Sequence, residues 1–273
     1  MLAINFVAVL GIAAMVSGWF FMRRYLQVSG KGVETAQDKR DAGLWFAVLF
    51  AAALLLRFIL AGKYKGNETD MNCFIAWADM VYGDGIKAFY TADAFTDYPP
   101  GYMYILWVIG AIRDLFGIAW DSTASIVLTK TPAILSDMAT GALLYHVGKR
   151  YLQGKGAVIL SALYLLCPAV ILDSAVWGQT DAVFTLLIVL MCYLVTEKKL
   201  IPAYFVFAVG ILIKPQSLIF TPVLIFGIVD QVFLEDFNWK KFWVNLGLGI
   251  AAILLIGVLM LPFGFQEALA QYT

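Results

Sequence analysis

Long apolar runs alternate with short polar stretches along most of the chain. The runs cover residues 2–22, 43–61, 125–147, 157–172, 183–196, 201–213, 217–234 and 243–263. A helix needs about 20 apolar residues to cross a bilayer, so the pattern predicts about eight transmembrane helices, several of them short or tilted. The first run lacks the basic start of a cleavable signal, and we interpret it as a span. The expected fold is all-α, a polytopic bundle of transmembrane helices.

Basic residues in the loops orient this bundle. They cluster at residues 23–40, 149–155, 198–199 and 240–241. All four clusters fall on one side of the membrane if the further apolar run 100–117 does not span, and the positive-inside rule makes that side cytoplasmic. We therefore expect an external amino terminus, and an interfacial or re-entrant helix at 100–117.

The longest connection, residues 62–99, is predicted to be an external loop, and loops of this length are usually functional. Within it, apolar residues recur at helical spacing, at Met71, Phe74, Ile75, Ala78, Val81 and Tyr82. This spacing predicts an amphipathic helix that lies on the membrane surface, with Thr69 or Asp70 as its N-cap.

Composition agrees with a membrane protein and limits the chemistry. Hydrophobic residues make up 62% of the 273 positions and charged residues 14%, against about 45–50% and about 25% in soluble domains, so the excess apolar surface has to face lipid. A net charge of zero gives no indication of nucleic-acid binding, and a single histidine, His146, excludes a histidine-based metal site. We expect no cofactor, with a divalent metal as the less favoured alternative.

Polar residues gather at the external ends of the runs, and each needs an explanation because a membrane-buried ionisable group costs about 2.5–3.5 kcal/mol. Asp70 is either a carboxylate that takes a proton from a hydroxyl or only a helix N-cap. The prolines that follow Asp97 and Tyr98 explain why the loop ends there, but not why an aspartate and a tyrosine precede them. Further on, Gln179 beside Asp181 indicates hydrogen bonds to a polar ligand. A plain external turn would explain Asp181 alone, and an interfacial position would explain Trp177.

Four isolated charges lie in or beside the predicted spans. Lys130 and Asp137 are seven residues apart, so they share one helix face and are expected to point into the bundle. Lys214 and Arg57 lie at external helix ends. There each either extends its charge to the interface or neutralises a phosphate.

Several motifs in order resemble the GT-C superfamily of membrane glycosyltransferases. They are Asp70, the run Asp97-Tyr98-Pro99-Pro100-Gly101-Tyr102, the run Trp177-Gly178-Gln179-Thr180-Asp181, and Lys214-Pro215-Gln216. The chain looks most like the bacterial proteins related to the GPI mannosyltransferases, and the Asp-Tyr-Pro-Pro run also resembles the lipid-linked-oligosaccharide glucosyltransferases of the endoplasmic reticulum. The resemblance covers residues 43–267. We therefore expect residues 1–42 to add a span and a cytoplasmic loop, and 43–273 to form a GT-C-like module that is incomplete at its carboxyl end.

The resemblance implies a transferase that moves a hexose, mannose above all, from a polyprenyl phosphate to an acceptor hydroxyl, with inversion and often without metal. It makes Asp70 the catalytic residue and Lys214 the first choice for the donor phosphate, with Arg57 and Lys130 behind it. The expected substrate-binding residues are Asp97, Tyr98, Trp177, Gln179, Asp181 and Asp137. The acceptor would be a glycan, lipid or protein at the external face of a bacterial plasma membrane.

Two other classes of protein would also place polar residues in a membrane bundle. A transporter or flippase for a lipid-linked sugar usually carries charges near the midplane and internal repeats. Here the charges favour one face and no repeat stands out. A non-catalytic membrane assembly protein is the third hypothesis, favoured only by the short chain.

Overall fold

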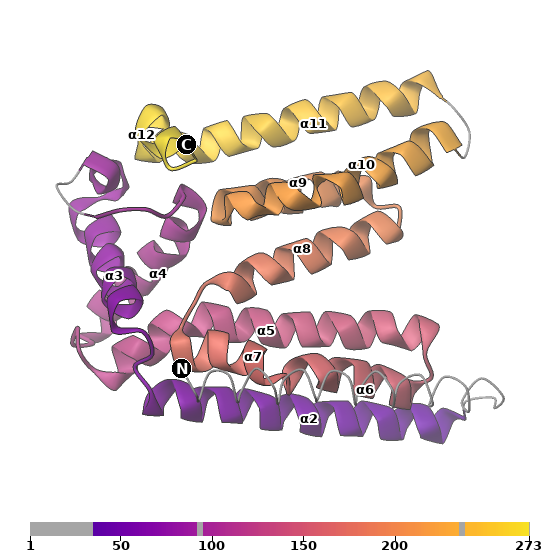
Figure 1. Cartoon of the computed structure of the whole chain (residues 1–273), viewed down its shortest axis with the longest axis horizontal. Coiled ribbons are helices and arrows are strands. Elements are labelled where there is room, and N and C mark those ends of the chain that lie inside the picture. The colour runs from indigo at the N-terminus through magenta and orange to yellow at the C-terminus, as the bar shows by residue number, and fades with distance from the viewer. Residues whose placement is uncertain (1–34, 92–94, 235–237, 273) are drawn as a thin grey trace, which may run out of the picture. The chain divides into compact units, whose positions relative to one another are not determined.

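The computed structural model describes residues 35–91, 95–234 and 238–272, and every described element is a helix (Figure 1). The expected all-α class is therefore confirmed, while the predicted span at 2–22 lies outside the described residues. The chain divides into two compact units. Unit 1 is drawn from Met1–Asn67 and Lys130–Ala182, and unit 2 comprises Glu68–Thr129 and Val183–Thr273.

Unit 1 is built on a long helix, α2, which pairs with α6 (Figure 1). Its elements are α2 (Ala36–Lys63), α5 (Thr123–Tyr151) from Lys130 onward, α6 (Gly154–Leu165), α7 (Pro168–Ile171) and the π-helix η3 (Leu172–Trp177). A capping box starts α2. The Thr35 hydroxyl accepts from the Asp38 N–H at 3.1 Å, and the Asp38 carboxylate accepts from the Thr35 N–H at 3.2 Å.

Small residues let α5 and α6 approach closely. A Cβ at Gly141 would overlap the side chain of Leu165, and the Ser161 hydroxyl donates to the Gly141 carbonyl at 2.8 Å. Ala53 of α2, Met138 of α5 and Leu165 of α6 form the apolar core of this unit. Close approach through small residues is how helices pack inside a membrane, where lipid removes the hydrophobic driving force.

Unit 2 contains the remaining helices. They are α3 (Glu68–Asp79), the π-helix η1 (Met80–Asp84), η2 (Ile86–Thr91), α4 (Pro100–Phe116), the start of α5, α8 (Asp181–Thr196) from Val183 onward, α9 (Leu200–Ile213), η4 (Pro215–Phe220), α10 (Thr221–Val229), the π-helix η5 (Asp230–Leu234), α11 (Trp239–Met260), η6 (Leu261–Phe263) and α12 (Phe265–Ala270). Helix α9 packs beside α11, and α3 packs on α4 (Figure 1).

Three described helical stretches are long and apolar enough to cross a membrane: Ala36–Lys63, Pro215–Leu234 and Trp239–Phe263. A fourth candidate is the pair Gly154–Leu165 and Pro168–Trp177, which is bent by 50°. Helices α8 and α9 are apolar but shorter. The run 100–117 forms α4, which is not among these candidates in the described residues. The count of eight spans stays a prediction.

The helix predicted in the external loop forms as α3, but its start differs from the expectation. It begins at Glu68, so Thr69 and Asp70 lie inside its first turn. The expectation that one of them is the N-cap is therefore wrong. A carboxylate in the first turn still stabilises a helix through the helix dipole.

The apolar face of α3 is covered by α4, and not only by lipid as the surface-helix prediction assumed. Met71, Phe74 and Ala78 are at most 2% exposed, and Gly110 of α4 admits the Ala78 carbonyl where a Cβ would overlap it. Tyr82 was expected on the same face but is 37% exposed. Tyr82 nevertheless contacts α4, because its ring centre lies 5.9 Å from that of Trp107.

Candidate active site

Two carboxylates of unit 2 lie close to one thiol. Burial raises the pKa of the Cys73 thiol, and the negative charges of Asp97 and then Asp70 raise it further. Nearby negative charges raise the pKa of a thiol because they disfavour its thiolate form. Asp70 and Asp97 are 27 positions apart in sequence, yet the fold brings them to the same thiol on α3. Asp97 is exposed and Asp70 half-buried, so the pair remains accessible.

An aromatic cluster holds the loop that carries Asp97. The Tyr98 ring packs against Phe74 and Trp77, with ring centres 5.4 and 5.5 Å away. The Trp77 indole N–H donates to the Phe95 carbonyl at 2.8 Å, and the Tyr90 hydroxyl donates to the Tyr98 carbonyl at 2.7 Å. The backbone on both sides of Asp97 is therefore held by Trp77 and Tyr90.

Gly101 places the start of α4 against the end of α9. A Cβ at Gly101 would overlap the backbone of Leu212 and Ile213, so a residue with a side chain would push the two helices apart. Lys214 follows Ile213 directly as the C-cap of α9, with an extended backbone and a half-buried side chain. The Asp97–Tyr102 run and Lys214, far apart in sequence, are therefore neighbours in unit 2.

In unit 1, Arg57 forms a buried ion pair with Asp137. The two side chains are 0% and 1% exposed, and Arg57 Nε lies 3.3 Å from the Asp137 carboxylate. Arg57 Nη1 also donates to the Leu165 carbonyl at 2.9 Å. The same carboxylate accepts from the Tyr164 hydroxyl at 3.0 Å and the Ser174 hydroxyl at 2.6 Å. Arg57 is thus buried inside unit 1, and the expectation that it extends to the interface is wrong.

Lys130 is also fully buried, as the shared helix face with Asp137 predicted. Its ammonium group donates to the carbonyls of Tyr64 at 2.7 Å, Ala175 at 3.1 Å and Val176 at 2.8 Å. These contacts and the ion pair of Arg57 occupy both cations within unit 1. Lys214 is half-buried, so it is more accessible to a phosphate than either of them.

The run Trp177–Asp181 connects η3 to α8 in unit 1. Gly178 adopts the left-handed region at φ 91°, and its N–H donates to the Asp173 carbonyl at 2.9 Å. Trp177 is 47% exposed, Gln179 and Asp181 are half-buried, and Asp181 is the first residue of α8. The sequence-based candidates thus form two groups, one in each unit.

Several residues that shape these groups escaped the sequence analysis. Cys73 was not among the candidates, and its exposure to the charges of Asp97 and Asp70 depends on how the Asp97 loop folds back on α3. Trp77 lies three residues after Phe74, so helical spacing could have found it. At Gly66 and Gly101 a backbone carbonyl from another segment packs where a Cβ would overlap it. No local sequence pattern indicates such a contact.

Within the described residues, no group of three histidine, cysteine, aspartate or glutamate side chains could hold a metal ion. The expectation of a metal-free site stays a prediction.

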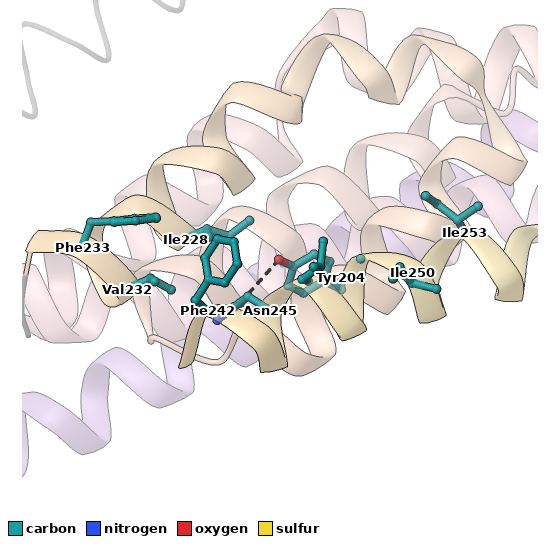
Figure 2. A pocket seen from close by; sticks show the side chains of 10 residues that line it. Tyr204, Ile228, Val232, Phe233, Phe242, Asn245, Ile250 and Ile253 are labelled. Carbon is teal, nitrogen blue, oxygen red and sulfur yellow. Dashed lines mark hydrogen bonds between the residues drawn. The ribbon is translucent and has the colours of Figure 1, made fainter. Parts of the chain in front are cut away.

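An apolar cavity of about 350 Å³ lies elsewhere in unit 2, among α9, α10, η5 and α11 (Figure 2). Ile228, Phe233 and Ile250 contribute to its lining. Its polar pair is Tyr204 and Asn245, whose hydroxyl and amide oxygens are 3.4 Å apart. No acid or base is part of this lining, so the cavity suits a hydrocarbon chain and not the transfer chemistry.

A family model supports the resemblance that the motifs indicated. The model for dolichyl-phosphate-mannose-protein mannosyltransferases matches residues 97–261, while no curated protein matches the chain. The match includes the Asp97–Tyr102 run, the Trp177–Asp181 run and Lys214, whereas Asp70 and Arg57 precede it. The match confirms that the chain is a member of the GT-C superfamily. With the long apolar helices, it makes the chain an integral membrane protein. The chain therefore belongs to the dolichyl-phosphate-mannose-protein mannosyltransferase family of membrane glycosyltransferases.

Proposed function

We propose that the chain transfers a hexose, mannose in the first instance, from a polyprenyl phosphate to an acceptor hydroxyl at the external membrane face, with inversion. Family membership makes it a membrane glycosyltransferase with a polyprenyl-phosphate sugar as donor. The observation that carries the proposal is the pairing, within unit 2, of two accessible carboxylates at Cys73 with the junction of α4 and α9 at Lys214.

Asp70 is the proposed general base. It takes the proton of the acceptor hydroxyl while the hydroxyl oxygen forms a bond to the anomeric carbon. The bond between that carbon and the phosphate oxygen breaks, and polyprenyl phosphate leaves with the electron pair. Attack from the face opposite the leaving group inverts the anomeric centre. Asp97, whose charge acts on the same thiol as that of Asp70, binds the sugar or the acceptor.

Lys214 is the proposed partner of the donor phosphate. A lysine ammonium is a compact cation and a common phosphate ligand. The start of α4 lies next to it at Gly101, and the amino end of a helix carries partial positive charge. These two positive features support phosphate binding at the junction. Trp177, Gln179 and Asp181 are proposed to bind substrate, and the acceptor is proposed to be a protein because of the family's name.

The test is transfer by the purified full chain in lipid vesicles. A short-chain polyprenyl-phosphate mannose, labelled in the sugar, is supplied from one side with membrane protein, glycolipid and soluble glycan fractions in separate reactions. We expect label in a new glycosidic bond, together with release of polyprenyl phosphate, only when donor is on the side opposite the basic loops. Movement of intact donor between leaflets, with no new bond, would replace this proposal with the flippase hypothesis. If neither a new bond nor donor movement is detected, the hypothesis of a non-catalytic assembly protein remains.

A further inference from the structure

Lys130 presents an energetic problem that its hydrogen bonds solve. It is 0% exposed, and a buried ammonium group is costly unless its protons are bonded. All three of its hydrogen bonds, to Tyr64, Ala175 and Val176, go to main-chain carbonyls. Three partners match the three protons of an ammonium group.

Those carbonyls belong to the ends of two helices. Tyr64 is the C-cap of α2, and Ala175 and Val176 lie in the last turn of η3. The last carbonyls of a helix lack partners within it, and they form the negative end of its dipole. A single cation between two such ends therefore satisfies both, and Lys130 joins the carboxyl ends of α2 and η3.

Gly66 packs the connection after α2 onto the same place. A Cβ at Gly66 would overlap the carbonyl oxygens of Val176 and Trp177, and its φ of +93° favours glycine in any case. The backbone at Gly66 therefore lies directly against the peptide that starts the Trp177–Asp181 run.

A second contact from α5 reaches η3 at Ser174, the residue directly before Ala175. The Ser174 hydroxyl donates to Asp137 at 2.6 Å, and Asp137 is itself paired with Arg57. Because Lys130 and Asp137 both belong to α5, this helix holds η3 at Ser174 and again at Ala175 and Val176. The segment beyond, Trp177–Asp181, thus starts from a fixed backbone.

We propose that Lys130 is a positioning residue for the transfer reaction: it clamps the ends of α2 and η3 and so holds the Trp177–Asp181 run in one arrangement. This inference rests on the proposed function, in which that run binds substrate. It replaces a direct role of Lys130 in binding the donor phosphate. A displacement of about 1 Å in a positioning group can cost about 10²-fold in rate.

The first test combines activity with labelling of the run itself. The full chain in nanodiscs carries Gln179→Cys in a background where Cys73, Cys167 and Cys192 are replaced by Ala, and Lys130→Met is added. We expect a severalfold faster reaction of the introduced thiol with a maleimide. A thiol introduced by Lys87→Cys, on an exposed residue of unit 2, is the control and should not change. Labelling reports on the Trp177–Asp181 run even in a protein without transferase activity. A failure of this inference can therefore be distinguished from a failure of the proposed function.

Activity is measured with Gln179 intact. We expect Lys130→Met to lower kcat about 10²-fold, with KM for the donor changed far less, and Lys130→Arg to recover part of the rate because it keeps charge and donors. Lys214→Ala, by contrast, should act mainly on KM. If Lys130→Met raises the donor KM as Lys214→Ala does while labelling at Gln179→Cys stays unchanged, Lys130 is a phosphate ligand and the inference is overturned.

A pair of glycine variants keeps the inference testable if Lys130→Met does not fold. Gly66→Ala pushes on the Trp177 carbonyl, whereas Gly85→Ala imposes the same left-handed strain, at φ +91°, with nothing within 4 Å of the new methyl group. We expect faster labelling and lower kcat with Gly66→Ala and parental values with Gly85→Ala. Equal behaviour of the two variants would show that the run is not held in this way.

Discussion

Three charged candidates of unit 1 and three of unit 2 lie in different surroundings. In unit 1, Arg57, Lys130 and Asp137 are at most 1% exposed and are bonded to one another or to main-chain carbonyls. In unit 2, Asp97 is exposed, and Asp70 and Lys214 are half-buried. An ionisable residue in a membrane protein is a functional candidate by default. The comparison teaches that burial and the kind of partner separate charges that build the fold from charges that can meet a substrate.

The two groups also differ in what their removal leaves behind. Loss of one partner from a buried pair leaves an uncompensated charge and destabilises a protein by about 3–5 kcal/mol. Loss of an accessible charge leaves water in its place and changes stability little. Loss of Arg57 should therefore act on folding first, and loss of Asp70 or Lys214 on catalysis or donor binding first.

The largest effect is expected at Asp70. Asp70→Asn keeps the size of the side chain and removes the base, and general-base catalysis contributes about 10²–10⁴-fold, so turnover should fall at least about 100-fold. The carboxylate in the first turn of α3 is worth only about 0.3–1 kcal/mol to the helix. The melting temperature in detergent should therefore barely move. Asp97→Asn is the companion variant, because Asp97 acts on the same thiol. Parental turnover in Asp70→Asn would refute the assignment, and a loss confined to Asp97→Asn would move the base there.

Arg57 should show the opposite result. Arg57→Met leaves Asp137 buried without its cation, and we expect a loss of about 3–5 kcal/mol in the free energy of unfolding. Arg113→Met is the matched control from unit 2, since Arg113 pairs with Asp79, which is 49% exposed and stays hydrated. Adding Asp137→Asn to Arg57→Met should recover part of the loss. Equal stability of Arg57→Met and Arg113→Met, measured by denaturant titration in micelles, would contradict the structural role of the buried pair.

Lys214 should affect donor binding more than folding. A hydrogen bond to a charged group contributes about 1.5–3 kcal/mol, so Lys214→Ala should weaken donor binding about 10- to 100-fold. Lys214→Arg should keep part of the affinity, because the charge remains while its geometry changes. Lys87→Ala removes another lysine of unit 2, an exposed one, and should bind donor like the parent. Displacement of a labelled donor by polyprenyl phosphate measures all three. Parental affinity in Lys214→Ala would leave the amine only an interfacial role.

The smallest effect concerns the reactivity of Cys73. Burial and the charges of Asp97 and Asp70 raise the pKa of its thiol, so less thiolate is present at a given pH. Removing either charge lowers that pKa, and Asp97→Asn or Asp70→Asn should therefore shift the rate profile for iodoacetamide to lower pH. Cys167 and Cys192 are replaced by Ala beforehand. Asp114→Asn is the control, because Asp114 hydrogen-bonds Tyr82 and does not act on Cys73. An unshifted profile in both variants would show that the charges of these carboxylates do not affect the pKa of the thiol.

Local patterns predicted the helices of this protein well. Apolar runs mark α2, α10 and α11 because a span has to present apolar side chains to lipid over its whole length. Helical spacing predicted α3, and the separation of seven residues placed Lys130 and Asp137 on one buried face. The motif order led to the GT-C superfamily, which the model match confirms. Each of these features is written in neighbouring residues, so a single sequence contains it.

The roles of the charges were not local, and only the tertiary structure decided them. Arg57 and Lys214 look alike in sequence, each a cation at the end of an apolar helix. One is buried against a carboxylate 80 residues away, and the other caps α9 beside the start of α4. The difference arises from which helix packs next to each cation, and therefore from contacts between residues far apart in the chain. The sequence by itself determined a helical membrane glycosyltransferase, and the packing decided which of its charges are enclosed and which remain accessible.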